Sequence, residues 1–276
     1  MPSSRSIHVA AAQVHSGGGV EATLARIRTQ ATAASTVGAD VLLLSECVLQ
    51  GYDYDIDRET TERISLPRES DPCQALQKMA AELNITVMAG FLERDDKSFY
   101  NSVLVAFPSG KTLVERKHCL SAIEANAGFS PGTPERIPIE INGVRCAILI
   151  CADVAIKGLA EAISAQGIDY QFISTGGGGK LSDMIHARDL GDPPVAARYA
   201  ESRANVFITE AILFDSRHTT GFAAANALGP VGRQTCHQGH CMIVDKHLVM
   251  RAQAAGTIVL EHQQDQMVHA VLDFDD

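Results

Sequence analysis

The sequence predicts an α/β fold with mixed strand pairing, and three observations lead to this fold class. Short apolar runs typical of strands alternate with amphipathic stretches of helical period along the chain. The length of 276 residues allows one large α/β domain or two small ones. No repeat, low-complexity tract or linker divides the sequence. We therefore expect a single domain over residues 1–276.

The first 107 residues predict strands that alternate with two helices. Apolar runs predict strands at residues 7–13, 41–44, 86–93 and 100–107. The last two are joined across Asp95 and Asp96, which is a hairpin signal. Residues 21–37 predict a helix that ends at Gly38, and residues 72–83 predict a helix that begins with a proline.

The middle of the chain predicts a strand, a long loop and a hairpin. Residues 112–116 read as a strand, whereas 118–134 show no periodicity and contain several glycines and prolines. A loop of that length inside a compact domain is more often functional than structural. Residues 137–141 and 144–150 predict two strands that pair across an Asn-Gly turn.

The remaining residues continue the α/β pattern. Residues 157–166 and 194–204 predict helices, and 206–211 predict an extended segment. We expect residues 176–179 to be a flexible loop at a pocket rim and 214–240 to be irregular. The strands predicted for this part lie at residues 170–175, 241–244, 248–251, 257–260 and 268–274.

Composition and charge indicate a soluble cytoplasmic protein. The net charge of −10 argues against nucleic acid or an anionic membrane as the main partner. No apolar run approaches the roughly 18–20 residues of a membrane span, and the N-terminal residues do not resemble a signal peptide. The seven cysteines are an odd number and are scattered, which favours free thiols in a reducing compartment.

Four reactive side chains follow predicted strands or lie in the long loop. Glu46, Lys117 and Cys151 come just after three separate strands, and Glu124 lies in the loop. A thiol is a useful nucleophile only as thiolate, which a neighbouring carboxylate can generate by taking the proton. A lysine can stabilise the thiolate and then an oxyanion. Taken singly, a cysteine such as Cys151 is more often a small core residue, and such acids and lysines are more often surface charges.

Around these residues the chain resembles the nitrilase, or carbon–nitrogen hydrolase, superfamily, whose catalytic glutamate, lysine and cysteine occur in that order. ADVLLLSECVLQGYD (39–53) is similar to the family's glutamate motif and VERKHCL (114–120) to its lysine motif. AILICADV (147–154) is similar to the nucleophile motif, and HQGHCMIVD (237–245) resembles a later strand start. Glu124 falls where many members carry a second glutamate.

The resemblance implies a four-layer α-β-β-α sandwich and a cysteine amidohydrolase without a cofactor, often a homodimer or a higher homo-oligomer. It implies that Cys151 attacks a small amide or N-carbamoyl compound, that Glu46 shuttles the proton, and that ammonia leaves. Lys117 and the backbone N–H of Ala152 would stabilise the oxyanion, and Glu124 would support Lys117 or orient the substrate. We expect Tyr52, Gly176 and Arg198 to contact the substrate together with Ala152.

Several positions depart from the family pattern. Ser45 replaces a proline, Cys119 stands where a histidine is common, and the usual Pro-Glu after the nucleophile motif is missing. Nitrilases proper usually carry tryptophan directly after the cysteine, whereas this chain has Ala152 and no tryptophan. We therefore expect an amidase or carbamoyl hydrolase. A nitrilase and a catalytically idle, ligand-binding member of the same fold remain the alternatives.

Three further motifs indicate other functions less strongly. CHQGHC (236–241) holds four possible zinc ligands, but ligands so contiguous do not easily converge, and no metal site is expected. TGGGGKLS (175–182) would suit a nucleotide-binding protein, but it lacks the Lys-Ser/Thr pair of a phosphate loop. Candidates for recognising a substrate carboxylate, besides Arg198, are Arg188, Arg203 and His218.

Overall fold

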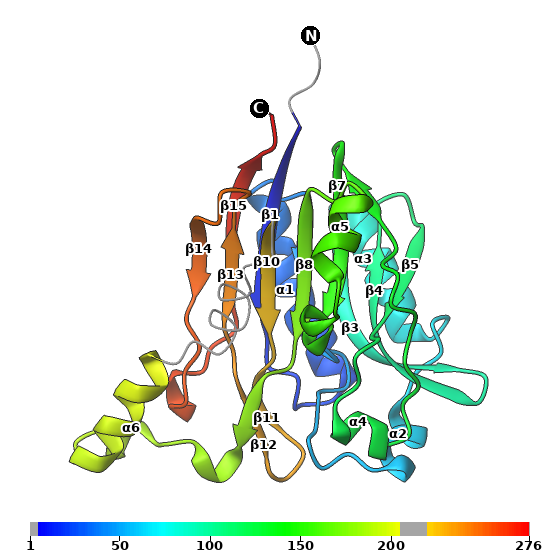
Figure 1. Ribbon diagram of the computed structural model, residues 1–276. Coiled ribbons are helices and arrows are strands. Elements are labelled where there is room, and N and C mark those ends of the chain that lie inside the picture. Colours follow the sequence, from blue (N-terminus) through cyan, green and yellow to red (C-terminus); the bar gives the residue numbers. More distant parts are fainter. Residues whose placement is uncertain (1–4, 205–219, 276) are drawn as a thin grey trace.

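Two mixed sheets pack face to face in the computed structural model, which describes residues 5–204 and 220–275 (Figure 1). The first sheet has the order β15-β1-β2-β3-β4-β5, and the second has the order β14-β13-β10-β8-β7-β6. The first contains β1 Ser6–Gln13, β2 Val41–Leu43, β3 Thr86–Asp95, β4 Ser98–Ala106, β5 Thr112–Arg116 and β15 Gln266–Asp273. The second contains β6 Ile139–Ile141, β7 Val144–Ile150, β8 Tyr170–Thr175, β10 Gly221–Asn226, β13 Cys241–Val244 and β14 Met250–Ala254.

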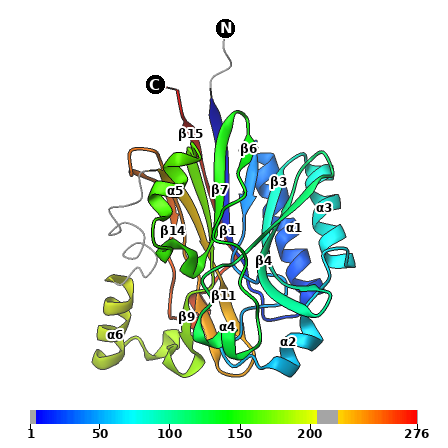
Figure 2. The ribbon, with the colours of Figure 1, turned by 45° about the vertical axis from the view of Figure 1, so that its right-hand side comes forward.

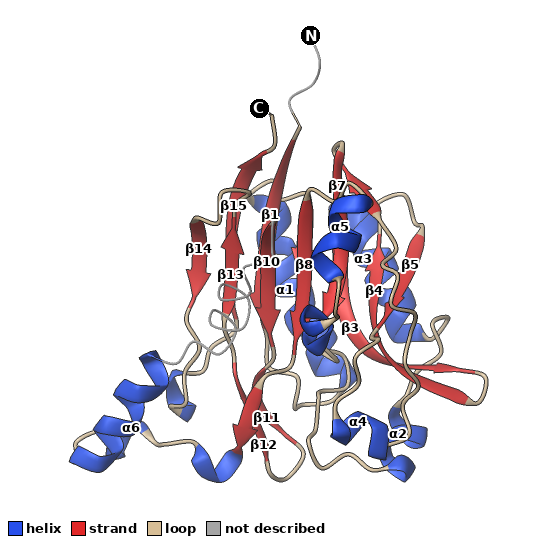
Figure 3. Ribbon diagram, viewed as in Figure 1, coloured by secondary structure: helices blue, strands red, loops and turns tan. Residues whose placement is uncertain are grey.

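A small third sheet and a set of helices complete the described fold (Figure 3). The small sheet contains β11 Leu228–Val231, β12 Thr235–Gln238 and β9 Gly178–Lys180. The helices are α1 Val20–Thr36, α2 Arg58–Ile64, α3 Asp71–Leu83, α4 Ala122–Asn126, α5 Leu159–Ala165 and α6 Pro193–Ala204. The 3₁₀ turns are η1 Cys151–Ala155, η2 Leu181–Asp183, η3 Ala187–Asp189 and η4 Leu260–His262. None of the described helices is long and apolar enough to cross a membrane.

The layering follows from strands that are buried on both faces. Leu43 of β2 and Ile148 of β7 belong to the core between the two large sheets, whereas Leu42 faces the side that α1 and α3 cover. On the opposite side, Leu149 of β7 packs in the core under α5. Successive residues of β2 and β7 point to opposite faces, and both kinds are apolar because both faces of each strand are covered. These strands therefore appear in the sequence as continuous apolar runs. Figure 2 shows the resulting α-β-β-α order, with α1 and α3 outside one sheet and α5 outside the other.

Helix α1 illustrates how the predicted elements form. Its buried residues Thr23, Ile27, Ala31 and Ala34 recur at helical spacing and face the first sheet. Helix α3 begins with Pro72 in its first turn and ends at Asn84, whose φ of 52° is left-handed. Both helices therefore confirm the sequence prediction within one residue at each end.

The strand directions bring several strand ends to one edge of the sandwich. Strands β1, β2 and β3 are parallel, and β5 runs with β3 because both are antiparallel to β4. In the second sheet β7, β8 and β10 are parallel. At the shared edge, Ser174 Oγ donates to the Leu44 carbonyl (3.0 Å) and the Glu46 N–H donates to the Thr175 carbonyl (3.2 Å). The carboxyl ends of β2 and β8 thus meet.

Several sequence predictions for this fold were wrong. Residues 214–240 were expected to be irregular, but their described part contains β10, β11 and β12. Strand β10 is rich in alanine, which favours strands weakly, and it lies buried between β8 and β13. Strand β11 tolerates Pro230 because it is the edge strand of the small sheet.

The remaining differences concern short elements. Residues 257–260 do not form a strand, because Val259 makes one isolated bridge with Ile185 and the chain then enters η4. The long loop after β5 contains the short helix α4, and the expected loop at 176–179 enters β9. Helix α2 was not predicted. The segment 206–211, which the sequence predicts to be extended, lies outside the described residues.

Candidate active site

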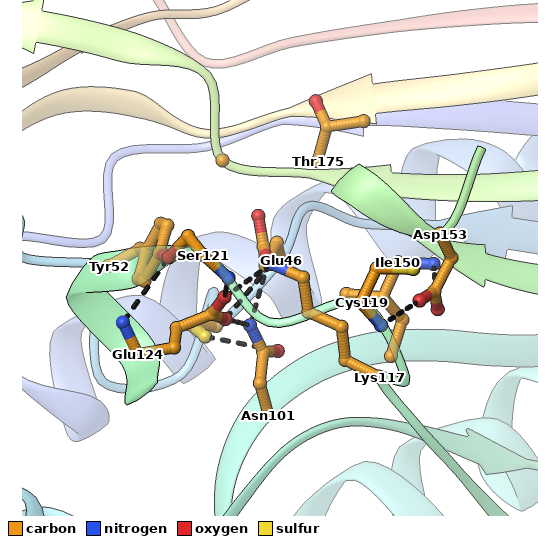
Figure 4. A network of polar contacts seen from close by, with 12 residues as sticks. Glu46, Tyr52, Asn101, Lys117, Cys119, Ser121, Glu124, Ile150, Asp153 and Thr175 are labelled. Atoms are coloured by element: carbon orange, nitrogen blue, oxygen red, sulfur yellow. Dashed lines mark hydrogen bonds and ion pairs between the residues drawn. The ribbon is translucent and has the colours of Figure 1, made fainter. Parts of the chain in front are cut away.

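The predicted site residues follow strands that end at the same edge of the sandwich. Glu46 lies in the turn after β2, Lys117 directly follows β5, and Cys151 directly follows β7. The two sheets each contribute part of the set, since β2 and β5 belong to one sheet and β7 to the other. Carboxyl ends of strands are where α/β proteins collect ligands and reactive groups. Figure 4 shows this region from close by.

Lys117 lies buried between two carboxylates. Its Nζ is 2.7 Å from Glu46 Oε1 and 2.9 Å from both carboxylate oxygens of Glu124 (Figure 4). All three side chains are shielded from solvent, with at most 1% of any of them exposed. The two carboxylates raise the pKa of Lys117 well above its usual value, although burial alone would lower it. Lys117 is therefore a cation held between two acids.

Asn101 completes this cluster, and the sequence reasoning missed it. Its Nδ2 donates to Glu46 Oε1 (2.7 Å) and to Glu124 Oε1 (2.5 Å), and its Oδ1 accepts from Cys47 Sγ (3.4 Å). Asn101 thereby bridges the two carboxylates without adding charge. One signal was visible in the sequence, because Asn101 and Ser102 are polar residues at the start of an otherwise apolar predicted strand.

Helix α4 places Glu124. Ser121 is the N-cap, its Oγ accepts from the Glu124 N–H (3.2 Å), and Glu124 Oε2 accepts from the Ser121 N–H (2.7 Å). This reciprocal capping box orients the Glu124 carboxylate before it meets Lys117. The hydroxyl groups of Tyr52 and Ser121 are also 3.2 Å apart, which connects Tyr52 to the same helix start.

Glu46 has one occupied and one available carboxylate oxygen. Oε1 accepts from both Lys117 and Asn101, whereas Oε2 is buried and accepts no hydrogen bond from the described residues. A Cβ on Gly176 would lie 2.7 Å from Oε2 and 2.6 Å from the Tyr52 ring, so Gly176 leaves space in front of that oxygen. Burial raises the pKa of Glu46, while the Lys117 charge opposes the rise.

Cys151 directly follows β7 and is the first residue of η1. Its φ of 47° lies in the left-handed region, which is uncommon for a residue other than glycine and often accompanies functional sites. Burial, and next the Glu46 charge, raise the pKa of the Cys151 thiol to about 12, while Lys117 and the backbone of Gly176 lower it. The thiol is therefore protonated at neutral pH, and a base must remove its proton before it can attack.

Aromatic side chains surround Gly176 and complete this region. Tyr54 Oη donates to the Gly176 carbonyl (2.9 Å), and the Tyr52 and His237 rings are stacked with centroids 6.4 Å apart. His237 Nε2 lies 2.6 Å from the Tyr52 carbonyl, and burial lowers the pKa of His237. Tyr54 and His237 are further residues that the sequence reasoning did not assign to this site.

The other predicted substrate contacts are distributed unevenly. Tyr52 and Gly176 lie against Glu46, and Ala152 follows Cys151 in η1 with a partly exposed side chain. Arg198 lies on α6, where its guanidinium donates to the Asp183 carbonyl (2.6 Å). Its observed contact is thus outside the Glu46–Lys117 cluster. Arg188 lies in η3 against Asp189, and the side chains of Arg203 and His218 lie outside the described residues.

The four possible ligands of CHQGHC do not converge on a common point. Cys236 contacts Gln263, His237 contacts Tyr52, and Cys241 is in the core between the sheets. The described residues contain no group of three or more His, Cys, Asp or Glu side chains arranged for a metal ion. The glycines after Thr175 enter strand β9 rather than a helix, so they do not form the phosphate loop of a nucleotide-binding protein.

The comparisons with known proteins agree on one family. A family model described as carbon-nitrogen hydrolase matches residues 8–257. The (R)-stereoselective amidase of a Pseudomonas species is 28% identical over 138 residues, which are 50% of this chain and 48% of that protein. The nitrilase of Pyrococcus abyssi is 26% identical over 136 residues, which are 49% of this chain and 52% of that protein. Each match thus spans about half the length of the relative.

Solved structures show the same fold. A CN-hydrolase superfamily protein of Xanthomonas campestris has a TM-score of 0.71 at 15% identity, covering 96% of this chain and 90% of its own. An amidase of Nesterenkonia has a TM-score of 0.67 at 19% identity, covering 99% of this chain and 92% of its own. In a mutant of the Nesterenkonia AN1 amidase, acrylamide has undergone Michael addition at the active-site cysteine.

Proposed function

The chain belongs to the carbon–nitrogen hydrolase family, and from that premise we propose that it hydrolyses a non-peptide C–N bond in a small amide or N-carbamoyl compound. One observation carries the proposal. A buried lysine lies between Glu46 and Glu124 at the sheet edge where Cys151 follows the end of β7. Cys151 is the nucleophile in this proposal, as a cysteine is in the Nesterenkonia amidase.

The reaction begins with a proton transfer to Glu46. Oε2 of Glu46 takes the proton of the Cys151 thiol, and the thiolate forms a C–S bond with the substrate carbonyl carbon. The C=O π electrons move to oxygen, where Lys117 Nζ and the Ala152 N–H stabilise the oxyanion. The unpartnered state of Oε2 supports this role, since Oε1 is already occupied by two donors.

Collapse of the tetrahedral intermediate breaks the C–N bond. Protonated Glu46 returns its proton to the departing nitrogen, ammonia leaves, and a thioester remains on Cys151. Glu46 then takes a proton from water, and the hydroxide adds to the thioester carbon. The C–S bond breaks, and the departing thiolate takes the proton back from Glu46. The products are a carboxylic acid, or a carbamic acid, and free enzyme. Glu124 keeps Lys117 charged and in position throughout, which its two 2.9 Å contacts support.

A nitrilase reaction is the second candidate, because the Pyrococcus abyssi nitrilase is among the relatives. A nitrile would add Cys151 across its triple bond and give a thioimidate instead of an oxyanion. The family's nitrilases place tryptophan after the cysteine, whereas Ala152 here leaves more room for a tetrahedral centre. We therefore favour amide or carbamoyl cleavage. A homodimer or a higher homo-oligomer stays a prediction of the family resemblance, and a cytoplasmic location stays a prediction from the composition and the cysteines.

The test is an ammonia-release screen over matched amides, carbamoyl compounds and nitriles, with the Cys151→Ala variant as the blank. We expect turnover in the wild type and none in the variant, whose circular dichroism should match the wild type. Iodoacetamide should label Cys151 faster than the buried Cys47, Cys73 and Cys146. Turnover that survives Cys151→Ala, together with faster labelling of another cysteine, would exclude the proposed nucleophile. Faster acid formation from a nitrile than from its amide would favour the second candidate.

A further inference from the structure

Asp153 is a buried acid that the proposed reaction does not use. Its Oδ1 accepts hydrogen bonds from the His118 N–H (3.0 Å) and the Cys119 N–H (2.8 Å). Its Oδ2 accepts from the Ile150 N–H (3.2 Å) and from Arg136 Nη1 (3.0 Å). The carboxylate is 0% exposed, so four donors satisfy a group that water does not reach.

These donors come from the two segments that hold the reactive side chains. His118 directly follows Lys117 at the end of β5, and Ile150 directly precedes Cys151 at the end of β7. The two strands belong to different sheets. Figure 4 shows the Asp153 carboxylate beside Cys119 and Ile150. One carboxylate thus joins the backbone at Lys117 to the backbone at Cys151.

A buried ion pair with Arg136 holds the Asp153 carboxylate in place. Arg136 Nη1 pairs with Asp153 and lies 3.2 Å from Glu115 Oε1, and the exposed fraction of all three side chains is at most 3%. Breaking such a buried pair leaves an uncompensated charge, so the arrangement resists displacement. A buried acid with a purely structural role needs only a charged partner such as Arg136. Asp153 has in addition three backbone amides that belong to the site segments.

We propose that Asp153 is a positioning residue that sets the separation between the Cys151 sulfur and the Lys117 ammonium group. This inference rests on the proposed function, because it assumes that Cys151 and Lys117 act on the same substrate carbonyl. Displacing a reacting group by about 1 Å can cost roughly 10²-fold in rate. Without Asp153, the turn after β7 and the segment after β5 lose the bonds that hold them together.

The test uses Asp153→Asn, whose side chain has nearly the same shape. The asparagine amide has one acceptor oxygen and one NH₂ donor group. The two donors that contact one of the Asp153 oxygens would therefore face the NH₂ group. We expect kcat to fall roughly 10- to 100-fold, with KM changed less than about threefold. We also expect the pH midpoint of Cys151 alkylation by iodoacetamide to rise, because Lys117, which lowers the pKa of the thiol, is held less closely. Loss of the Asp153 charge alone would move that midpoint the other way.

Asp245→Asn is the matched control. Asp245 is also buried and accepts from two backbone N–H groups, of His247 and Val249, and from Arg251 Nε. Asp245 follows Val244, which pairs with the start of β10. The candidate active site lies at the opposite end of β10, so Asp245 is remote from it. We expect Asp245→Asn to lower the melting temperature as Asp153→Asn does and to leave kcat and the alkylation midpoint unchanged.

The outcomes separate this inference from the proposed function. If Cys151 of the wild type is not selectively alkylated, the proposed function fails. If wild-type Cys151 is selectively alkylated, two results with folded Asp153→Asn would show that the positioning role is wrong. One is a kcat within threefold of the wild type, and the other is a pH midpoint of Cys151 alkylation that is unchanged or lower. Should Asp153→Asn not fold, Asp153→Glu keeps the charge but lengthens the side chain. Wild-type kcat in folded Asp153→Glu would then overturn the inference, and a loss of tenfold or more would support it.

Discussion

Lys117 faces two carboxylates in a space that solvent does not reach. Taking charged groups out of water is costly unless each is paired and hydrogen-bonded. Asn101 meets that need with two amide hydrogens, one for each carboxylate, and Cys47 orients its oxygen. The neutral amide therefore separates two acids that would otherwise repel each other across a single cation.

Replacing Asn101 by leucine should test this role. Glu46 and Glu124 each lose a donor, and a hydrogen bond to a charged group contributes about 1.5–3 kcal/mol. At about 1.4 kcal/mol for each factor of ten, kcat/KM should fall roughly 10- to 100-fold. Losing a donor also raises the pKa of the Glu46 carboxylate, so the acid limb of the kcat/KM profile should move to higher pH. An unchanged acid limb in a folded variant would contradict this account.

At the scale of elements, the turn after β2 determines where Glu46 points. This turn packs on Gly90 of β3, where a Cβ would lie 2.3 Å from the Cys47 nitrogen and 2.5 Å from the Ser45 carbonyl oxygen. Both contacts are to backbone atoms, which cannot move aside as a flexible side chain can. Gly90 is therefore needed for close approach between β3 and the segment that holds Glu46.

Gly90→Ala should consequently impair activity as well as stability. Overpacking of this kind costs about 1–3 kcal/mol of unfolding free energy. Because the methyl group pushes on the backbone at Glu46, kcat should also fall by roughly tenfold or more. The measurements are urea denaturation and steady-state kinetics. Gly191→Ala is the control, since a Cβ there meets nothing within 4 Å, and it should leave both quantities unchanged. Wild-type kinetics in Gly90→Ala would show that this contact does not position Glu46.

At the scale of the whole molecule, several buried acids make stability depend on pH. Glu115 is 3% exposed, and burial raises its pKa from 4.5 to about 7 in spite of the Arg136 charge. The folded state therefore binds the proton of Glu115 more tightly than the unfolded state does. Its contribution to stability is fully present below about pH 4.5 and is lost as the pH rises through about 7.

Glu115→Gln should remove this dependence, because the amide stays neutral. The unfolding free energy of the variant minus that of the wild type should rise between pH 5 and pH 8. At about 1.4 kcal/mol per unit of pKa difference, the rise should be at most about 3 kcal/mol. Denaturant titrations at four pH values would measure it. Asp57→Asn is the control, because hydrogen bonds from Thr60 hold the pKa of Asp57 below its usual range, so the difference should be flat between pH 5 and pH 8. A flat difference for Glu115→Gln as well would contradict the prediction.

The sequence by itself determined the fold class, the family and most of the elements. Strands such as β2 and β7, and helices α1 and α3, were predictable because their burial pattern repeats within a few residues. The order of Glu46, Lys117 and Cys151 after three strands was equally visible, since strand ends are local features. Their roles in the reaction stay predictions.

Only the tertiary structure decided which side chains share the site with these three. Asn101 is 55 residues from Glu46 and 23 from Glu124 in the sequence, yet its side-chain amide donates a hydrogen bond to each of them. Asp153, Tyr54 and His237 likewise find their partners on other elements. Periodicity reports which face of a strand or helix is buried, but it carries no information about which distant segment covers that face. Sheet order and register supply that information, and they form only when the whole chain folds.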